Sequence, residues 1–178
     1  PGPDDELLLR PGTRAALVLT DAERSRLAAH GINPLQSLRT AGERRLSLRT
    51  LAGGTGRSAD SSLLTSRRRT LLVMGSIERG TRWAVFDAGD RNVWYKITRQ
   101  VQDFLRPLAE AGLFGAGDAA DACYVVCDER VNTAHDMNEG RVNLLVGLRS
   151  GRAGEYFSFM VSHSNGGSRV RPARANRL

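Results

Sequence analysis

Apolar positions along this chain follow two periods, one near 3.6 residues and one near 2. The helical period predicts helices over residues 20–31, 66–80 and 93–112, and a short capped helix or turn over 132–140. In 93–112 the apolar positions recur at spacings of three and four residues, which predicts one buried stripe. That stripe contains Trp94, Ile97, Val101, Phe104 or Leu105, and Leu108, and the opposite face contains Lys96, Arg99, Gln100, Asp103 and Arg106.

Short apolar or alternating runs predict the strands. They cover residues 15–20, 81–87, 122–128, 141–148 and 155–163, with a further hairpin over 35–51 and a loop over 52–62. Helices and strands in this order predict an α+β fold. We expect a small mixed or antiparallel sheet with helices packed on it and extended terminal arms.

Residues with strong terminal preferences mark the ends of the predicted helices. Thr20 and Glu23 have the spacing of a capping box, and Gly31 supplies a left-handed stop. Asn92 is the predicted N-cap of the long helix. Pro107 lacks a backbone donor and is predicted to kink or shorten that helix near its end.

A length of 178 residues is enough for one compact domain with trailing arms. Residues 1–13 are rich in proline and glycine and are predicted to form a flexible arm. The domain itself is predicted to cover 14–163. Residues 164–178 are basic and non-periodic, which predicts a tail that orders only on a partner.

The net charge of +7 favours a partner with an anionic surface. Lys96 is the single lysine among 26 basic residues, a bias that coding composition explains as readily as guanidinium chemistry does. A basic nucleic-acid-associated domain is the alternative function, but the sequence contains no zinc-finger spacing, aromatic ribonucleoprotein motif or base-reading helix-turn-helix. No apolar run approaches the roughly 18–20 residues that span a bilayer, so the sequence predicts a soluble chain without a membrane partner.

Two cysteines, Cys123 and Cys127, lie in a predicted strand, on one face but too far apart for a relaxed disulfide. They are predicted to be buried free thiols in a reducing compartment. A single Cys-x-x-x-Cys pair with no second ligand pair is weak support for zinc.

The three histidines, His30, His135 and His163, have no metal-type spacing. His135 with Asp136 and the distant Cys127 suggests a thiol-protease pair, but no oxyanion or elbow motif accompanies it. The sequence therefore predicts no catalytic residue, no metal site and no cofactor, and a protein that is not an enzyme.

The order of short motifs resembles the C-terminal region of contractile tail sheath proteins, the family of contractile phage tails, R-type pyocins and related injection systems. The resemblance runs from about Leu27 to Val161. It rests on a Gly-Ile-Asn turn at 31–33, arginines at 67–69, the RGTRW run at 79–83, the amphipathic segment 94–105, Cys-Asp at 127–128 and an acidic turn closing on Gly-Arg at 136–141.

This resemblance implies a structural subunit that polymerises as a helical sheath around an inner tube and contracts to drive it. It implies other copies of the chain, the inner tube protein, and baseplate and terminator proteins as partners. It also implies cytoplasmic assembly, followed by a place in a phage tail or contractile particle.

Two sets of residues are expected to make those contacts. Lys96, Arg99 and Arg106 are predicted to face an acidic tube surface; the alternative is an ordinary solvated helix face. A second set is predicted to pair as a strand with adjacent subunits; the alternative is an internal strand of the domain's own sheet. This set is Glu155, Tyr156, Phe157, Ser158, Phe159, Met160 and Val161.

Overall fold

The structure is a computed structural model that describes residues 17–34, 50, 64–87, 90–115, 117–149 and 156–173. Contacts divide the chain into two units, Pro1–Thr70 and Leu71–Leu178, which are described separately. The hairpin predicted over 35–51, apart from residue 50, and the loop predicted over 52–62 lie outside the described residues.

A four-stranded antiparallel sheet forms the centre of the second unit, in the order β1-β2-β3-β4. Every neighbouring pair is consecutive in sequence, so the sheet is a simple meander. The strands are β1 (Cys123–Val126), β2 (Val142–Arg149), β3 (Tyr156–Ser164) and β4 (Gly167–Ala173). With the helices described next, this confirms the predicted α+β class and the antiparallel sheet.

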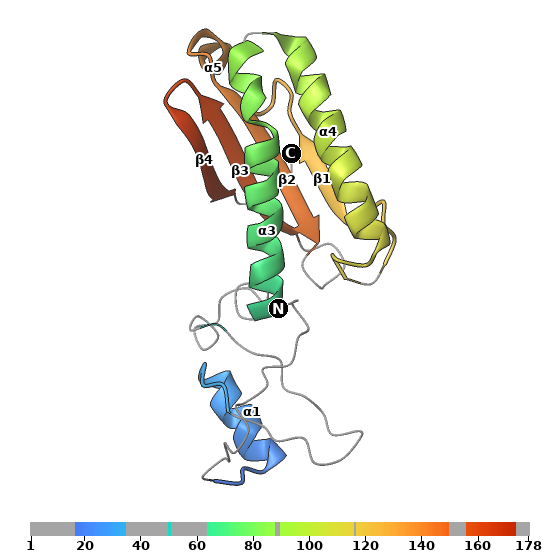
Figure 1. Cartoon of the computed structure of the whole chain (residues 1–178), viewed down its shortest axis with the longest axis vertical. Coiled ribbons are helices and arrows are strands. Elements are labelled where there is room, and N and C mark those ends of the chain that lie inside the picture. The colour runs from blue at the N-terminus through green and yellow to red at the C-terminus, as the bar shows by residue number, and fades with distance from the viewer. Residues whose placement is uncertain are drawn as a thin grey trace. The chain divides into compact units, whose positions relative to one another are not determined.

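Helices cover one face of this sheet (Figure 1). They are the part of α3 (Leu64–Gly80) that follows Thr70, the 3₁₀ helix η2 (Arg82–Asp87) and α4 (Arg91–Glu110), while α5 (Ala134–Asn138) lies in the β1–β2 connection. The core between the layers includes Ile97 and Leu105 from α4 and Val146 and Phe159 from the sheet, all fully buried. Burying one such side chain contributes about 1.5–3 kcal/mol to folding.

The buried stripe of α4 is the predicted one, with Leu105 rather than Phe104 inside. The N-cap prediction was wrong by two residues: Asp90 is the N-cap, and its carboxylate accepts from the Asn92 backbone amide at 2.8 Å. Asp90 and Asn92 both lie at the start of α4, and Asp and Asn cap helices about equally well, so residue type alone does not show which of them is the N-cap. The helix continues past Pro107 to Glu110.

The strand predicted for 81–87 is instead the helix η2. The Thr81 hydroxyl donates to the Ile77 carbonyl at 2.7 Å, and the Ala84 amide donates to the Thr81 carbonyl at 3.1 Å, so the chain keeps turning after α3. Thr81 and Ala84 are buried whereas Phe86 is 88% exposed, a three-residue period rather than a two-residue one.

Part of the predicted C-terminal tail is also a strand of the sheet. Ser164 pairs with Gly167 across a two-residue turn, and β4 then runs antiparallel to β3 as far as Ala173. The expectation that this segment orders only on a partner was therefore wrong for 164–173. A Ser-Asn-Gly-Gly turn followed by alternating residues is a hairpin signal that the basic composition concealed.

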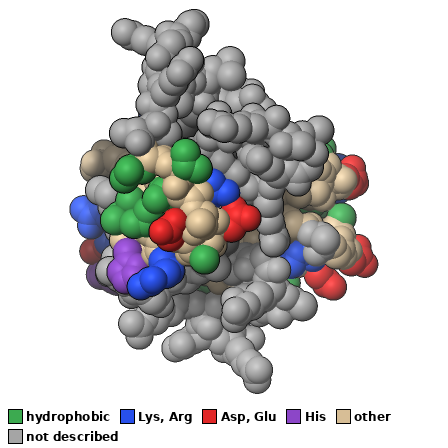
Figure 2. Space-filling model, turned by 90° about the horizontal axis from the view of Figure 1, so that it is seen from below, with side chains coloured by type: hydrophobic (Ala, Val, Ile, Leu, Met, Phe, Trp, Pro, Cys, Tyr) green, Lys and Arg blue, Asp and Glu red, His purple; other side chains and the backbone are tan. Residues whose placement is uncertain are grey.

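The described part of the first unit contains α1 (Asp21–Ala29), and its ends are the predicted ones. Thr20 and Glu23 form a capping box, and Gly31 has a φ of 78°. No strand includes residues 17–20, contrary to the strand predicted at 15–20. Leu17, Val18 and Ile32 are exposed. Figure 2 shows hydrophobic side chains grouped on one face of the molecule beside charged ones.

Candidate assembly surfaces

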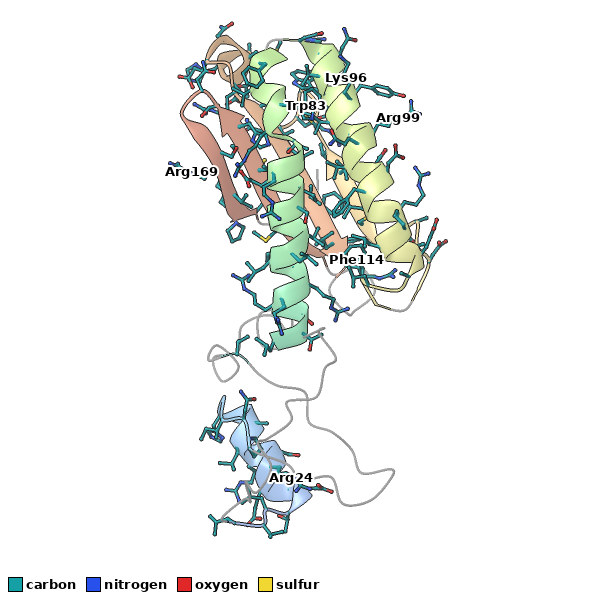
Figure 3. All side chains as sticks on the ribbon, in the orientation of Figure 1. Arg24, Trp83, Lys96, Arg99, Phe114 and Arg169 are labelled. Atoms are coloured by element: carbon teal, nitrogen blue, oxygen red, sulfur yellow. The ribbon has the colours of Figure 1, made fainter. Side chains whose placement is uncertain are left out.

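The outward face of α4 carries the predicted tube-contacting residues, because the helix buries its opposite side. Val93, Ile97, Val101 and Leu105 face the sheet at helical spacing. Lys96, Arg99 and Arg106 are all exposed. In Figure 3, Lys96 and Arg99 project from the outer side of the helix. The structure thus places the three predicted residues on one accessible face.

An aspartate partly neutralises that face. Asp103 accepts from Arg106 at 3.0 Å and lies 3.9 Å from Arg99, and all three side chains are more than half exposed. Lys96 forms no ion pair within the described part of the chain. Exposed pairs of this kind contribute only about 0–1 kcal/mol each. Both arginines can therefore exchange Asp103 for an acidic partner at small cost.

Gln100, placed on the polar face by sequence, connects α4 to its neighbours. Its amide oxygen accepts from Trp83 Nε1 at 3.0 Å, and its nitrogen donates to the Gly80 carbonyl at 3.0 Å. One side chain therefore ties α4 to both η2 and the last residue of α3. Together with the buried stripe of α4, this contact holds the helix in the rotation at which Lys96 and Arg99 point outward.

The predicted inter-subunit strand lies inside the sheet. Residues 156–161 belong to β3, which pairs with β2 on one side and with β4 on the other. Both backbone edges are thus taken within the chain, and the prediction of a donated strand at 156–161 conflicts with this structure. Glu155 lies outside the described residues. The alternating pattern of residues 155–163 correctly predicts a strand, but it does not show that this strand lies between two others in the sheet.

In the described part of the chain no strand pairs with the outer side of β4, so β4 forms an edge of the sheet, which was missed in the sequence. The two-residue turn makes Ser164 and Gly167 the first hydrogen-bonded pair, and such pairs alternate along an antiparallel ladder. Arg169 and Arg171 therefore bond toward β3, whereas Ser168 and Val170 direct their amide and carbonyl groups outward. Pro172 also faces outward, and proline is tolerated at that position because its missing N–H is on the open side.

The open edge of β4 is consequently short and basic. It offers two complete donor–acceptor residues, Ser168 and Val170, before Pro172 removes the next donor. Arg169 and Arg171 are exposed, and Arg169 projects from β4 in Figure 3. Charges and proline on an edge strand oppose indiscriminate pairing. The edge fits one short incoming strand better than a long one.

The thiol-protease pairing considered from sequence has no support in the described geometry. Burial raises the pKa of the Cys127 thiol to about 12, despite a hydrogen bond from Asn132 that lowers it. The ring of His135 lies 3.2 Å from Glu139 on the exposed side of α5. Cys123 is also a free thiol, and burial raises its pKa.

Among the described residues, no group of three or more His, Cys, Asp or Glu side chains is arranged to hold a metal ion. None of the described helices combines the length and apolarity needed to cross a membrane.

Comparison with known proteins finds likenesses among solved structures only. No family model matches the chain, and no curated protein matches it. A solved structure matches with a TM-score of 0.60 at 21% identity: a chain in the 6-fold symmetrised cryo-EM structure of the anti-feeding prophage (AFP) baseplate. The match covers 79% of this chain and 38% of that one, so this chain spans about two fifths of its neighbour's length. At this identity the likeness establishes a shared fold.

Proposed function

We propose that this chain is a structural subunit of a contractile particle, and more narrowly a sheath-type subunit that assembles with its own copies around an inner tube. The observation that carries the proposal is the fold shared with a chain of a six-fold prophage baseplate. The motif order resembling tail sheath proteins points to the same class of particle. The proposed role is mechanical, with neighbouring subunits held together while their packing changes.

Two surfaces suit that role. The outward face of α4, with Lys96, Arg99 and Arg106, is the proposed contact with an acidic tube. Because each exposed ion pair is weak, the grip can be released, yet many copies sum to a firm hold. In a subunit that is not bound to the tube, Asp103 partly neutralises the charges of Arg99 and Arg106.

The link between neighbouring subunits is proposed at the open edge of β4 rather than at β3. An incoming strand can bond to the backbone of Ser168 and Val170, and such bonds do not depend on side-chain identity. A link of this kind tolerates rotation between subunits better than an interlocked side-chain interface.

Electron microscopy of the purified chain tests the proposal. Rings or tubes are the expected result, and particles that stay monomeric at every concentration would refute self-assembly through this chain. Val170→Pro removes an outward amide donor and is expected to abolish polymers, whereas Val170→Thr keeps the donor and serves as the matched control. Both variants must first show the far-ultraviolet circular dichroism of the parent.

The tube contact is tested in the assembled particle. Lys96→Glu with Arg99→Glu is expected to weaken co-assembly with the inner tube while leaving the fold intact, because both side chains are exposed. Arg130→Glu reverses an exposed charge outside α4 and serves as the control. Unchanged co-assembly of the double variant would remove the α4 face from the proposal. Salt-sensitive binding to DNA instead would favour the nucleic-acid alternative.

A further inference from the structure

A buried histidine joins the end of α3 to the β3–β4 hairpin. His163 has 0% of its surface exposed, and each ring nitrogen has a partner from a different segment. Nε2 lies 2.7 Å from the Thr81 hydroxyl, just after α3, and Nδ1 lies 2.7 Å from the Ser168 hydroxyl on β4. Neither the tube contact nor the strand link uses this histidine.

Hydrogen bonding fixes where the ring proton sits. The Thr81 hydroxyl has one hydrogen, which it donates to the Ile77 carbonyl at 2.7 Å. The same oxygen must then accept from His163, so Nε2 carries the proton. In a neutral ring Nδ1 is an acceptor, and the Ser168 hydroxyl donates to it. The bonds thus form one directed chain from β4 through β3 to the last turn of α3.

Burial makes a second proton on this ring unfavourable, and two charged groups nearby modify that effect. Glu78 and Arg82 face it from the α3–η2 side, bound to each other by two bonds of 2.7 and 3.0 Å. Burial lowers the pKa of His163, Glu78 raises it and Arg82 lowers it further. Arg82 also keeps the pKa of Glu78 below its usual range, so Glu78 is a carboxylate already neutralised by its partner.

We propose that His163 is a pH-sensitive latch, a neutral imidazole that holds the β3–β4 hairpin on the end of α3 and loosens it when the ring gains a second proton. A proton on Nδ1 turns that atom into a donor, so the Ser168 hydroxyl must accept and its own hydrogen must rotate away. The hydrogen bond reverses, and the second proton places a positive charge on a ring with no exposed surface, a burial cost that opening of the hairpin relieves. The latch shares only Ser168 with the β4 edge, through the hydroxyl and not the backbone, and it stands whether or not the chain forms a sheath.

The sign of the pH effect follows from linkage. A folded-state pKa below the ordinary 6.5 means that the unfolded chain binds this proton more readily. The contribution of His163 to stability is therefore fully present above pH 6.5 and decreases as the pH falls below it. At pH 5.0, if the folded ring stays neutral, the unfolding equilibrium constant rises by up to about 30-fold from this group.

Nuclear magnetic resonance of the imidazoles tests the protonation state directly. The chain has three histidines, and His30 and His135 are exposed. We expect one of the three rings, identified as His163 by its absence in His163→Gln, to be an Nε2–H tautomer with a lowered midpoint. An Nδ1–H tautomer of that ring, or an ordinary midpoint for it, would overturn the proposal.

Urea unfolding at pH 7.5 and 5.0 tests the consequence. The parent should lose stability on acidification, His163→Gln should lose less, and His135→Gln should match the parent. Where His163→Gln does not fold, Arg82→Gln takes its place: it removes a cation that lowers the pKa of His163, and the midpoint of His163 should rise toward its ordinary value. An unchanged midpoint in Arg82→Gln would contradict this electrostatic account.

Hydrogen exchange tests whether protonation of His163 loosens the β3–β4 hairpin or leaves it unchanged. The amides of Arg169 and Arg171 bond to β3, and their protection factors should fall between pH 7.5 and 5.0 in the parent. The amides of β2 that pair with β1 provide the internal reference. Equal changes in both sets would show that acid does not act on the hairpin and would refute the latch.

Discussion

Gly147 on β2 is a position where one added methyl group should have a large effect. A Cβ there would lie 2.0 Å from Tyr124 Cε1 and 2.4 Å from Cζ, because the tyrosine ring crosses the backbone of the neighbouring strand. The ring is held in place by a 2.8 Å hydrogen bond from its hydroxyl to Ser158 and by an edge contact with Tyr156. Gly147→Ala must therefore displace Tyr124.

The loss of stability expected for Gly147→Ala follows from the contacts that the Tyr124 ring would lose. Overpacking costs about 1–3 kcal/mol. A lost neutral hydrogen bond costs about 0.5–1.5 kcal/mol, and a lost aromatic pair costs a similar amount. Because a displaced ring relieves some of the overpacking, we expect about 3 kcal/mol in total. For a chain of this size that corresponds to a melting temperature roughly 6–12 °C lower.

Urea and thermal unfolding of three variants measure this effect. Gly166→Ala is the matched control: its added Cβ would meet nothing closer than 3.8 Å, and little change is expected. In a Tyr124→Ala background, the same Gly147→Ala change should cost under about 1 kcal/mol, because the obstructing ring is absent. The reasoning is refuted if Gly147→Ala matches the parent, or if its cost is the same with and without the ring.

Three further predictions concern other single contacts. Arg149→Ala should destabilise by about 1–3 kcal/mol in urea, since its guanidinium donates to the carbonyls of Phe114, Gly115 and Asp118; Arg149→Lys should recover only part of this. Thr133→Ala should cost about 1 kcal/mol by removing the cap of α5, and Thr133→Ser should not. Cys127 should resist iodoacetamide at pH 8 until the chain unfolds, because burial raises its pKa to about 12; rapid labelling of the native protein would contradict that burial.

Elements defined by local interactions were predicted well from sequence. The capping boxes of α1 and α5 each lie within four consecutive residues. The hydrogen bonds between Thr20 and Glu23 can therefore be predicted from their spacing in the sequence alone. The stripe of α4 was equally legible, because one helix face meets one sheet face. Lys96, Arg99 and Arg106 were placed on the accessible side for the same reason.

The failures required knowledge of distant partners. A short apolar run such as 81–87 fits a strand or a tight helix, and the Thr81 bond back to Ile77 decides between them. The alternation in 156–164 does not say whether the strand is internal or at an edge, which depends on β4. Gln100 is exposed as its place on the polar face predicts, but its bonds to Trp83 and Gly80 join residues 17 and 20 positions apart and could not be seen in the sequence.

Ser168 belongs to both the proposed link and the proposed latch, through different atoms. Its backbone groups point to the open edge, whereas its hydroxyl points to His163. Ser168→Ala therefore removes the latch bond and leaves the edge intact, while Val170→Pro blocks the edge and leaves the latch residues unchanged. If assembly were lost in Val170→Pro alone, and the amides of Arg169 and Arg171 lost protection in Ser168→Ala alone, the two devices would be independent. Loss of assembly at low pH in the parent, but not in His163→Gln, would instead mean that the latch controls how the edge is presented to a neighbouring subunit.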